Sequence, residues 1–412
     1  MTDNTSLKSF FGLPEEVIFC KNCVISNQRP SSTVEFKHTR DEKKATIGFS
    51  DDGICDACKY HLVKAKEINW KDREEHLVAT LDRFRRKDGD YDVVVPGSGG
   101  KDSAFTSHIL KYRYGMNPLT VTWAPHLYTD IGWQNFQNWC HIGGHDNILF
   151  TPNGKLHRLL TRLSFHNLLH PFQPFIVGQR IIGPRIAAKF GIQLVVYGEN
   201  QAEYGNNVKE NYIPTMDRKF FSTQNPYDLV LGGVKVSDII KDHNYTINDF
   251  TPYIPPNADY LNDRGIEVHY LGYYLPWDPQ ECYYYAVENT GFQPNSERTP
   301  GTYSKYSSID DKIDMFHYYT TLIKFGIGRA TYDAAQEVRN GKITREEAVH
   351  LVQKYDQEFP KKFFKDFLEY ISTTEGEFWE TVDKFRSPHL WEKRNSEWHL
   401  KHTVWRGDDG NY

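Results

Sequence analysis

This chain of 412 residues has a small net charge, no long apolar run and few cysteines. The formal net charge is −5 at pH 7, from 49 Lys and Arg against 54 Asp and Glu. Proteins that bind nucleic acid usually carry a basic surface, so we expect no nucleic-acid partner. No apolar run approaches the roughly 20 residues of a membrane helix, and the N-terminal stretch lacks the basic start and apolar core of a signal peptide. We therefore expect a cytoplasmic protein with no membrane partner.

The few cysteines are grouped. Four of the six form two CxxC pairs near the N-terminus, Cys20 with Cys23 and Cys55 with Cys58. In a reducing compartment such pairs are more typical of metal binding than of disulfides, and four thiolates suit tetrahedral Zn²⁺. The spacing predicts a structural zinc site, with an iron–sulfur cluster or redox pairs as the alternatives.

Short apolar segments alternate with helical ones through the middle of the chain. Strands are predicted at residues 92–96, 119–123, 147–151, 193–197 and 267–273. Helices are predicted between them, at residues 104–114, 131–140, 156–169 and 184–190. This alternation is typical of a doubly wound parallel α/β sheet.

The remaining segments suggest a three-part organisation. We expect a zinc-ribbon-like subdomain and connector over residues 1–75, with a hairpin between the cysteine pairs, and the α/β domain over 76–300. The rest, 301–412, reads as a helical region. An irregular insert at about 204–264, with one short helix near 236–241, is a candidate lid or binding loop.

Local signals mark several helix starts. Ser308 with Asp311, and Thr344 with Glu347, have the spacing of capping boxes. Asp278 is expected to cap a helix that Pro279 opens and Gly291 ends.

The stretch VVVPGSGGKDSAF, residues 93–105, carries the clearest chemical signal. A β-branched run enters a glycine-rich elbow, where backbone N–H groups and a helix N-terminus can bind an anion. It is not a Walker P-loop, because the first glycine of that motif would fall on Val95 and Lys101 is followed by Asp102. A dinucleotide fingerprint would need a glycine at Asp102.

The elbow instead resembles the SGGxDS pyrophosphate loop of the ATP pyrophosphatase (PP-loop) superfamily, over roughly residues 90–290. That superfamily cleaves ATP between the α and β phosphates and forms an adenylate. The resemblance implies that Lys101 offsets phosphate charge, and that Thr122 and Trp123, which end the second strand, lie where this superfamily usually recognises adenine through the backbone. It also implies a pyrophosphate cradle made of Ser98, Gly99, Gly100, Asp102 and Ser103, with Asp102 near Mg²⁺.

The end of the fourth predicted strand places acidic residues at the same edge of the sheet. In VVYGENQAEY, Gly198, Glu199 and Glu203 follow the strand directly. Ligands of open α/β sheets collect at this edge, and carboxylates there can bind Mg²⁺. The alternative is a solvated loop with ordinary acidic residues.

Motifs along nearly the whole chain resemble one family, the N-acetyl sugar amidotransferases of bacterial surface-polysaccharide biosynthesis. They are FCKNCV, DDGICDAC, VPGSGGKDS, LVVYGENQAEYG, YLGYYLPWDPQE and TPGTYSKYSSIDDKIDMFHYYTTLIKFGIGRATYDA. The resemblance implies conversion of an N-acetyl group to an acetamidino group on an N-acetylated sugar or a pseudaminic- or legionaminic-type nonulosonic acid. ATP would form an O-adenylylated imidate that ammonia then attacks.

The source of ammonia and the remaining catalytic residues follow from what the chain contains. It has no glutaminase motif, so ammonia would come from solution or from a separate glutaminase subunit, and the family resemblance implies the separate glutaminase. Lys305, in SKYSSIDDK, could reach phosphate together with Ser304 and is a catalytic candidate beside Lys101 and Asp102; an ordinary helix cap is an equally good interpretation.

The sequence is also compatible with two other functions. A zinc-containing tRNA sulfurtransferase shares SGGKDS and the paired cysteines, but only the isolated Cys140 and Cys282 are left as reactive thiols. A nucleotide-binding scaffold without turnover is the second alternative.

Overall fold

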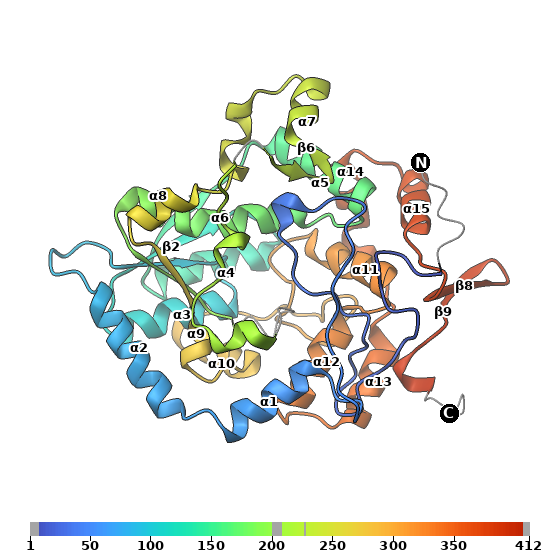
Figure 1. Cartoon of the computed structure of the whole chain (residues 1–412), viewed down its shortest axis with the longest axis horizontal. Coiled ribbons are helices and arrows are strands. Elements are labelled where there is room, and N and C mark those ends of the chain that lie inside the picture. Colours follow the sequence, from blue (N-terminus) through green and yellow to red (C-terminus); the bar gives the residue numbers. More distant parts are fainter. Residues whose placement is uncertain (1–7, 200–207, 226–227, 407–412) are drawn as a thin grey trace.

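The computed structural model describes residues 8–199, 208–225 and 228–406 (Figure 1). Its centre is a five-stranded parallel sheet with the order β3-β2-β1-β4-β7. The strands are β1 (Val93–Pro96), β2 (Pro118–Trp123), β3 (Asp146–Phe150), β4 (Leu194–Tyr197) and β7 (Glu267–Tyr270). The predicted doubly wound parallel sheet is therefore confirmed. Because the strand order reverses between β1 and β4, their carboxyl ends form the switch point at which such sheets bind ligands.

Alternate residues of the central strand pack on opposite faces of the sheet. Val94 belongs to the core that α6 covers, whereas Val93 and Val95 lie in a second core beneath α2 and α3. A strand covered on both faces must be apolar throughout, which explains the uninterrupted VVV run. The covering helices are α2 (Trp70–Phe84), α3 (Lys101–Tyr112), α4 (Asp130–His141), α5 (Gly154–Leu168), α6 (Gln173–Phe190), α9 (Leu271–Tyr274) and α10 (Pro279–Thr290).

Helix α6 extends well beyond its predicted start at residue 184. It begins at Gln173 and contains Pro184 in its interior. Proline cannot donate to the carbonyl four residues earlier, which belongs to Arg180. The Tyr197 hydroxyl of β4 donates instead to the carbonyls of Gln179, at 3.1 Å, and Arg180, at 3.4 Å. This tertiary contact lets the helix continue through the proline.

The insert after β4 is more ordered than predicted. It contains the short strands β5 (Val230–Leu231) and β6 (Val234–Lys235), helix α7 (Val236–His243) and helix α8 (Ala258–Asp263), with short 3₁₀ turns between them. Phe250 and Tyr253 of one such turn are fully buried in the main core, and the Tyr253 hydroxyl lies 2.7 Å from His157 Nδ1. Much of the insert is therefore part of the folded body.

The segment between the cysteine pairs does not form the predicted hairpin. It shows isolated bridges, Pro30 with Thr46 and Phe49 with Cys55, and a 3₁₀ turn at Glu35–Lys37. Helix α1 (Asp56–Lys66) follows the second pair directly. Glu35 is buried against His38 and His170, so polar tertiary contacts shape this segment more than strand pairing does.

The C-terminal region is mainly helical, as predicted, and also contains one hairpin. Its helices are α11 (Asp314–Phe325), α12 (Arg329–Arg339), α13 (Arg345–Tyr355), α14 (Phe364–Ile371) and α15 (Glu375–Lys384), and the hairpin strands are β8 (Trp391–Arg394) and β9 (Glu397–Leu400). In Figure 1 the blue N-terminal segment runs beside the orange helices α12 and α13. No helix within the described residues is long and apolar enough to cross a membrane.

The helix caps of this half follow the sequence in two of three cases. Thr344 and Glu347 form the predicted capping box, and Asp278, Pro279 and Gly291 bound α10 as predicted. The capping box predicted at Ser308 and Asp311 is wrong. Helix α11 starts at Asp314, five residues after the start that a cap at Ser308 would give, because the Asp311 carboxylate is occupied by contacts with the loop after β2.

Candidate functional site

A cavity of about 480 Å³ opens at the carboxyl ends of β1 and β4. Three parts of the chain surround it: the glycine elbow, the end of β4 with the neighbouring face of α6, and the segment that leads into α11 and α12. The site is therefore shared between the α/β core and the C-terminal region.

The elbow has the backbone geometry that its glycines allow. Gly99 has φ +84°, and a Cβ there would lie 2.8 Å from the Phe136 Cα. A Cβ on Gly97 would lie 2.0 Å from the Ser103 Cβ. Gly100 then caps α3 without a side-chain hydrogen bond, so the N–H groups of the first helical turn are available to an anion in the cavity.

Two adjacent charged residues begin α3 and line the cavity. Lys101 Nζ lies 2.6 Å from Asp102 Oδ2, and both side chains are mostly buried. The other oxygen, Asp102 Oδ1, is buried without a hydrogen-bond partner within the described residues. A buried carboxylate oxygen without a donor suits a metal ion, so Asp102 fits the expected position next to Mg²⁺.

Glu199, at the end of β4, faces the same cavity. Burial raises its pKa to about 7, and the nearby Asp102 carboxylate adds to the shift, while Lys101 and Arg180 partly oppose it. Two buried carboxylates this close together favour a shared cation. Gly198 also lines the cavity, whereas Glu203 falls outside the described residues. Asp102 and Glu199 are thus the described residues that could hold Mg²⁺.

The C-terminal region contributes a second set of acidic residues. Asp310 and Asp314 both line the cavity. Burial raises the pKa of Asp310, an effect that a hydrogen bond from Ser98 partly offsets. Burial also raises the pKa of Asp314 to about 7, against the opposing charge of Arg329. Arg329 is held by Asp333, with Nε 2.9 Å from Oδ1.

Three of the sequence-predicted residues do not line this cavity. Thr122 is fully buried, and its hydroxyl accepts from Asn147 at 3.0 Å. Trp123 is buried against α6, where a Cβ on Gly178 would meet its ring at 2.2 Å. Lys305 points elsewhere, and its Nζ donates to the Ser296 carbonyl at 3.0 Å. Of the remaining predicted nucleotide residues, Ser98, Gly100, Lys101, Asp102, Ser103 and Gly198 line the cavity directly, and Gly99 shapes its backbone.

Three residues that line the cavity could not be assigned to it from the sequence. Asp314, His317 and Arg329 reach it from the C-terminal helices. They lie within the long motif SSIDDKIDMFHYYTTLIKFGIGRA, but nothing in their local spacing indicates that they face a cavity.

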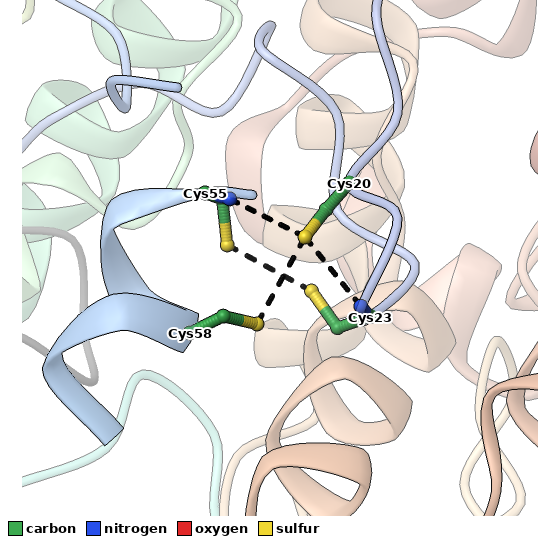
Figure 2. A group of neighbouring side chains, drawn as sticks. All are labelled: Cys20, Cys23, Cys55 and Cys58. Carbon is green, nitrogen blue, oxygen red and sulfur yellow. Dashed lines mark hydrogen bonds between the residues drawn. The ribbon is translucent and has the colours of Figure 1, made fainter. Parts of the chain in front are cut away.

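The four N-terminal cysteines meet as predicted (Figure 2). Their Sγ atoms all lie within 4.8 Å of one another, and the Cys20–Cys58 and Cys23–Cys55 pairs are each 3.9 Å apart. Tetrahedral zinc with Zn–S bonds of about 2.3 Å would place sulfurs about 3.8 Å apart, so the cluster fits Zn²⁺. The Cys55 backbone N–H donates to Cys20 Sγ at 3.3 Å, as shown by a dashed line in Figure 2.

The cysteine cluster is built into the C-terminal region. The four cysteines share a buried core with apolar residues of α12 and α13, including Ala334 and Ala348. Arg345 Nε donates to the Cys20 and Cys23 carbonyls at 3.4 and 3.2 Å. A metal at this cluster would therefore support both the N-terminal segment and the helices beside the cavity.

The C-terminal region matches a known protein family. Residues 300–404 match the family "LPS biosynthesis protein WbpG-like, C-terminal domain". The predicted resemblance to bacterial surface-polysaccharide biosynthesis proteins is thereby confirmed for this region. Asp310, Asp314 and Arg329 all lie within the WbpG-like region, so this region lines part of the cavity. No curated protein matches the chain.

Comparison with solved structures finds more distant similarities. An NH3-dependent NAD synthetase from Campylobacter jejuni is 16% identical, with 33% of this chain and 59% of that protein covered and a TM-score of 0.27. An NMN synthetase from Francisella tularensis is 14% identical over 61% of this chain and 94% of its own, with a TM-score of 0.27. An NAD+ synthetase from Burkholderia pseudomallei is 13% identical over 58% and 98%, with a TM-score of 0.24. This chain thus spans about three-fifths of the Campylobacter protein's length.

Proposed function

We propose that the protein is an ATP-dependent amidotransferase that converts the N-acetyl group of a bacterial surface sugar into an acetamidino group. The observation that carries the proposal is the composition of the cavity. A glycine elbow suited to pyrophosphate and the acidic residues of a WbpG-like region line the same space. Phosphate chemistry and a polysaccharide-related region therefore meet at one site.

The chemistry requires activation, because an acetamide carbonyl is a poor electrophile. We propose that the acetamide oxygen attacks the α-phosphate of ATP, which gives an O-adenylylated imidate and releases pyrophosphate. Ammonia then displaces AMP and leaves an amidine. We infer that the ammonia comes from a separate glutaminase, since the chain has no glutaminase motif.

The residues of the cavity have distinct proposed roles. The first-turn N–H groups of α3 and the Lys101 ammonium bind the departing pyrophosphate, and Ser98, Gly99, Gly100, Asp102 and Ser103 shape its cradle. Such preorganised donors stabilise charge that develops in the transition state. Mg²⁺, if held by Asp102 and Glu199, would supply further neutralisation of phosphate charge.

Exclusion of water is part of the proposed mechanism, because water would return the imidate to acetamide. The cavity lies between the sheet edge and the C-terminal helices, and Met216 of the insert lines one wall. The insert remains our candidate for the cover of this site.

The experiment is a mass-spectrometric assay with ATP, Mg²⁺, ammonium and a panel of N-acetylated nucleotide sugars and nonulosonic acids. We expect AMP and a product in which one acetamide oxygen is replaced by an imine nitrogen. Turnover with ammonium but not with glutamine would identify the ammonia source as a separate chain. If no sugar yields AMP, even with a glutaminase added, the proposal is wrong.

A further inference from the structure

A second cavity, of about 190 Å³, adjoins the first. The residues that line both are Lys101, Tyr306, Ser307, His317, Tyr318 and Arg329. Its outer end includes the partly exposed side chains of Gln280 and Asn340. At about 30 Å³ per water molecule, this space suits a few water-sized molecules and is too small for a nucleotide sugar.

The second cavity is polar and carries several acidic groups. Asp278, Asp333 and Glu337 line it, and so do the cations Lys101, Arg29, Arg329 and Arg339. Burial and the Asp333 charge raise the pKa of Glu337 to about 7. Because charged groups of both signs line this space, a small polar molecule can enter it more readily than an apolar one.

Two side chains of α11 face the first cavity near its boundary with the second. Asp314 lines the first cavity and His317 lines both, and because they are three residues apart they share one face of the helix. Asp314 takes part in no ion pair of the described residues, in contrast to Asp311, which is held by His126. His317 Nδ1 is buried without a hydrogen-bond partner within the described part of the chain. Burial holds the His317 pKa well below its ordinary value, so this ring is neutral and has one nitrogen free to accept.

We propose that ammonium binds in the first cavity beside Asp314 and His317, next to the boundary with the second cavity, and that Asp314 accepts a proton from it to generate the ammonia nucleophile. This inference rests on the proposed amidotransferase function. Ammonium has four N–H donors and no acceptor, which matches a carboxylate and a neutral imidazole nitrogen. The second cavity is then the route by which the nitrogen source reaches the imidate.

The step is balanced in atoms and charge. Ammonium gives one proton to the Asp314 carboxylate and becomes ammonia. The ammonia lone pair forms a C–N bond at the imidate carbon, one hydrogen moves to the original nitrogen, and the C–O bond to AMP breaks with AMP taking the electron pair. The product is an amidinium, and Asp314 returns its proton to solvent.

The groups around Asp314 suit this role. Burial and the charges of Asp310 and Asp311 raise its pKa, while Arg329 of α12 and the Ser308 hydroxyl lower it, with a net value of about 7. Burial raises the pKa of Tyr318 on the same helix, so this phenol stays neutral. A general base with a pKa near the working pH is the most effective, and its removal costs about 10²–10⁴-fold in rate.

Turnover with ammonium compared with turnover with hydroxylamine distinguishes a general-base role of Asp314 from a structural one. Hydroxylamine is neutral near pH 8 and needs no deprotonation before it attacks, whereas ammonium does. We expect Asp314→Asn to lower turnover with ammonium by about 100-fold or more and to retain near wild-type turnover with hydroxylamine. The exposed Asp383→Asn should behave as wild type with both nucleophiles.

Equal loss with both nucleophiles would overturn the role of Asp314, as would an increased Mg²⁺ requirement in Asp314→Asn. The route is tested separately with Thr321→Phe, which narrows only the second cavity. We expect a KM for ammonium raised about tenfold or more with an unchanged KM for ATP, and an unchanged ammonium KM would refute the route. If the wild-type protein forms no AMP with any sugar, the proposed function itself fails, which is a different result from either of these.

Discussion

His126 donates both its backbone N–H and its ring Nδ1–H to one oxygen of Asp311, each at 2.7 Å. The two residues are 185 positions apart, and their side chains are 0% and 2% exposed. The other Asp311 oxygen accepts from the backbone N–H groups of Leu127 and Ile313. One buried carboxylate thus joins the loop after β2 to the start of α11.

Removal of this carboxylate should destabilise the whole protein. We expect Asp311→Ala to lower the free energy of unfolding by about 3–5 kcal/mol, because it leaves several buried donors without an acceptor. Urea unfolding followed by circular dichroism measures the change. Glu380→Ala, which removes an exposed pair with Lys384, serves as the control and should change stability by about 0.5 kcal/mol or less. Similar losses in both variants would mean that the Asp311 contacts contribute little.

The conformation of the elbow predicts opposite tolerance at two neighbouring glycines. Gly99→Ala places a Cβ at φ +84° and 2.8 Å from the Phe136 backbone, so we expect a loss of about 2–4 kcal/mol. Gly100→Ala meets only Ser98 Oγ, at 3.6 Å, and should fold nearly as well as wild type. Thermal unfolding of the two variants tests this, and equal melting temperatures would contradict the backbone assignment.

The raised pKa of Glu199 makes stability depend on pH. Because the folded-state pKa is about 7 and the ordinary pKa of a glutamate is 4.5, the folded protein binds a proton that the unfolded chain has lost between these two pH values. The favourable contribution of Glu199 to the free energy of unfolding is therefore present below about pH 4.5 and is lost as the pH rises through 7. We expect Glu199→Gln to stabilise the ligand-free protein by about 1–3 kcal/mol at pH 8 and by much less at pH 5.

Denaturation of wild type and Glu199→Gln at several pH values tests this sign. The same substitution should abolish Mg²⁺-dependent AMP formation if Glu199 helps to hold the metal. A variant that is less stable than wild type at pH 8 would show that the carboxylate is not destabilised by its surroundings.

The cysteines differ in their expected response to substitution. If the cluster binds zinc, Cys23→Ser should remove the metal and lower the free energy of unfolding by several kcal/mol, because the four thiolates would hold it and they share a core with α12 and α13. Cys140→Ser with Cys282→Ser should retain about one zinc per chain and retain amidine formation. Metal analysis by mass spectrometry and the sugar assay give both readouts. Loss of turnover only in the second variant would support sulfur transfer instead.

The two candidate catalytic lysines should also differ. Lys101 lines the cavity beside Asp102, so Lys101→Ala should reduce the rate of AMP formation by about 10²–10³-fold. Lys305 donates to the Ser296 carbonyl outside the cavity, and we expect Lys305→Ala to keep its rate within about threefold of wild type. Initial rates of pyrophosphate release measure both, and a large loss at Lys305 would indicate that its segment moves onto the nucleotide.

The parts of the fold that depend on local pattern could be predicted from the sequence. The strands and the glycine elbow follow from apolar runs and from backbone freedom at Gly99. The full length of α6 could not be predicted, because helix formation through Pro184 depends on the distant Tyr197 hydroxyl. The capping box at Ser308 failed for the same kind of reason, since His126 takes the carboxylate that would have formed it.

Some residues of the candidate site could likewise be predicted from the local sequence, and others depend on tertiary packing. Asp102 and Glu199 could be expected at the sheet edge because parallel strands end together there. Asp314, His317 and Arg329 reach the cavity only through the packing of α11 and α12, which no spacing in the sequence indicates. Thr122 and Trp123 end β2 as predicted, but tertiary contacts bury their side chains away from the cavity.

The core shared by the cysteine cluster and the C-terminal helices bears on how the chain is made. The cysteines leave the ribosome first, whereas the apolar residues that bury them, such as Ile327, Ala348 and Val404, are synthesised at the end. The N-terminal segment therefore cannot reach its final packing during most of translation. Zinc captured early would hold the four thiolates together until α12 and α13 arrive, so metal supply during synthesis would determine how much nascent protein matures.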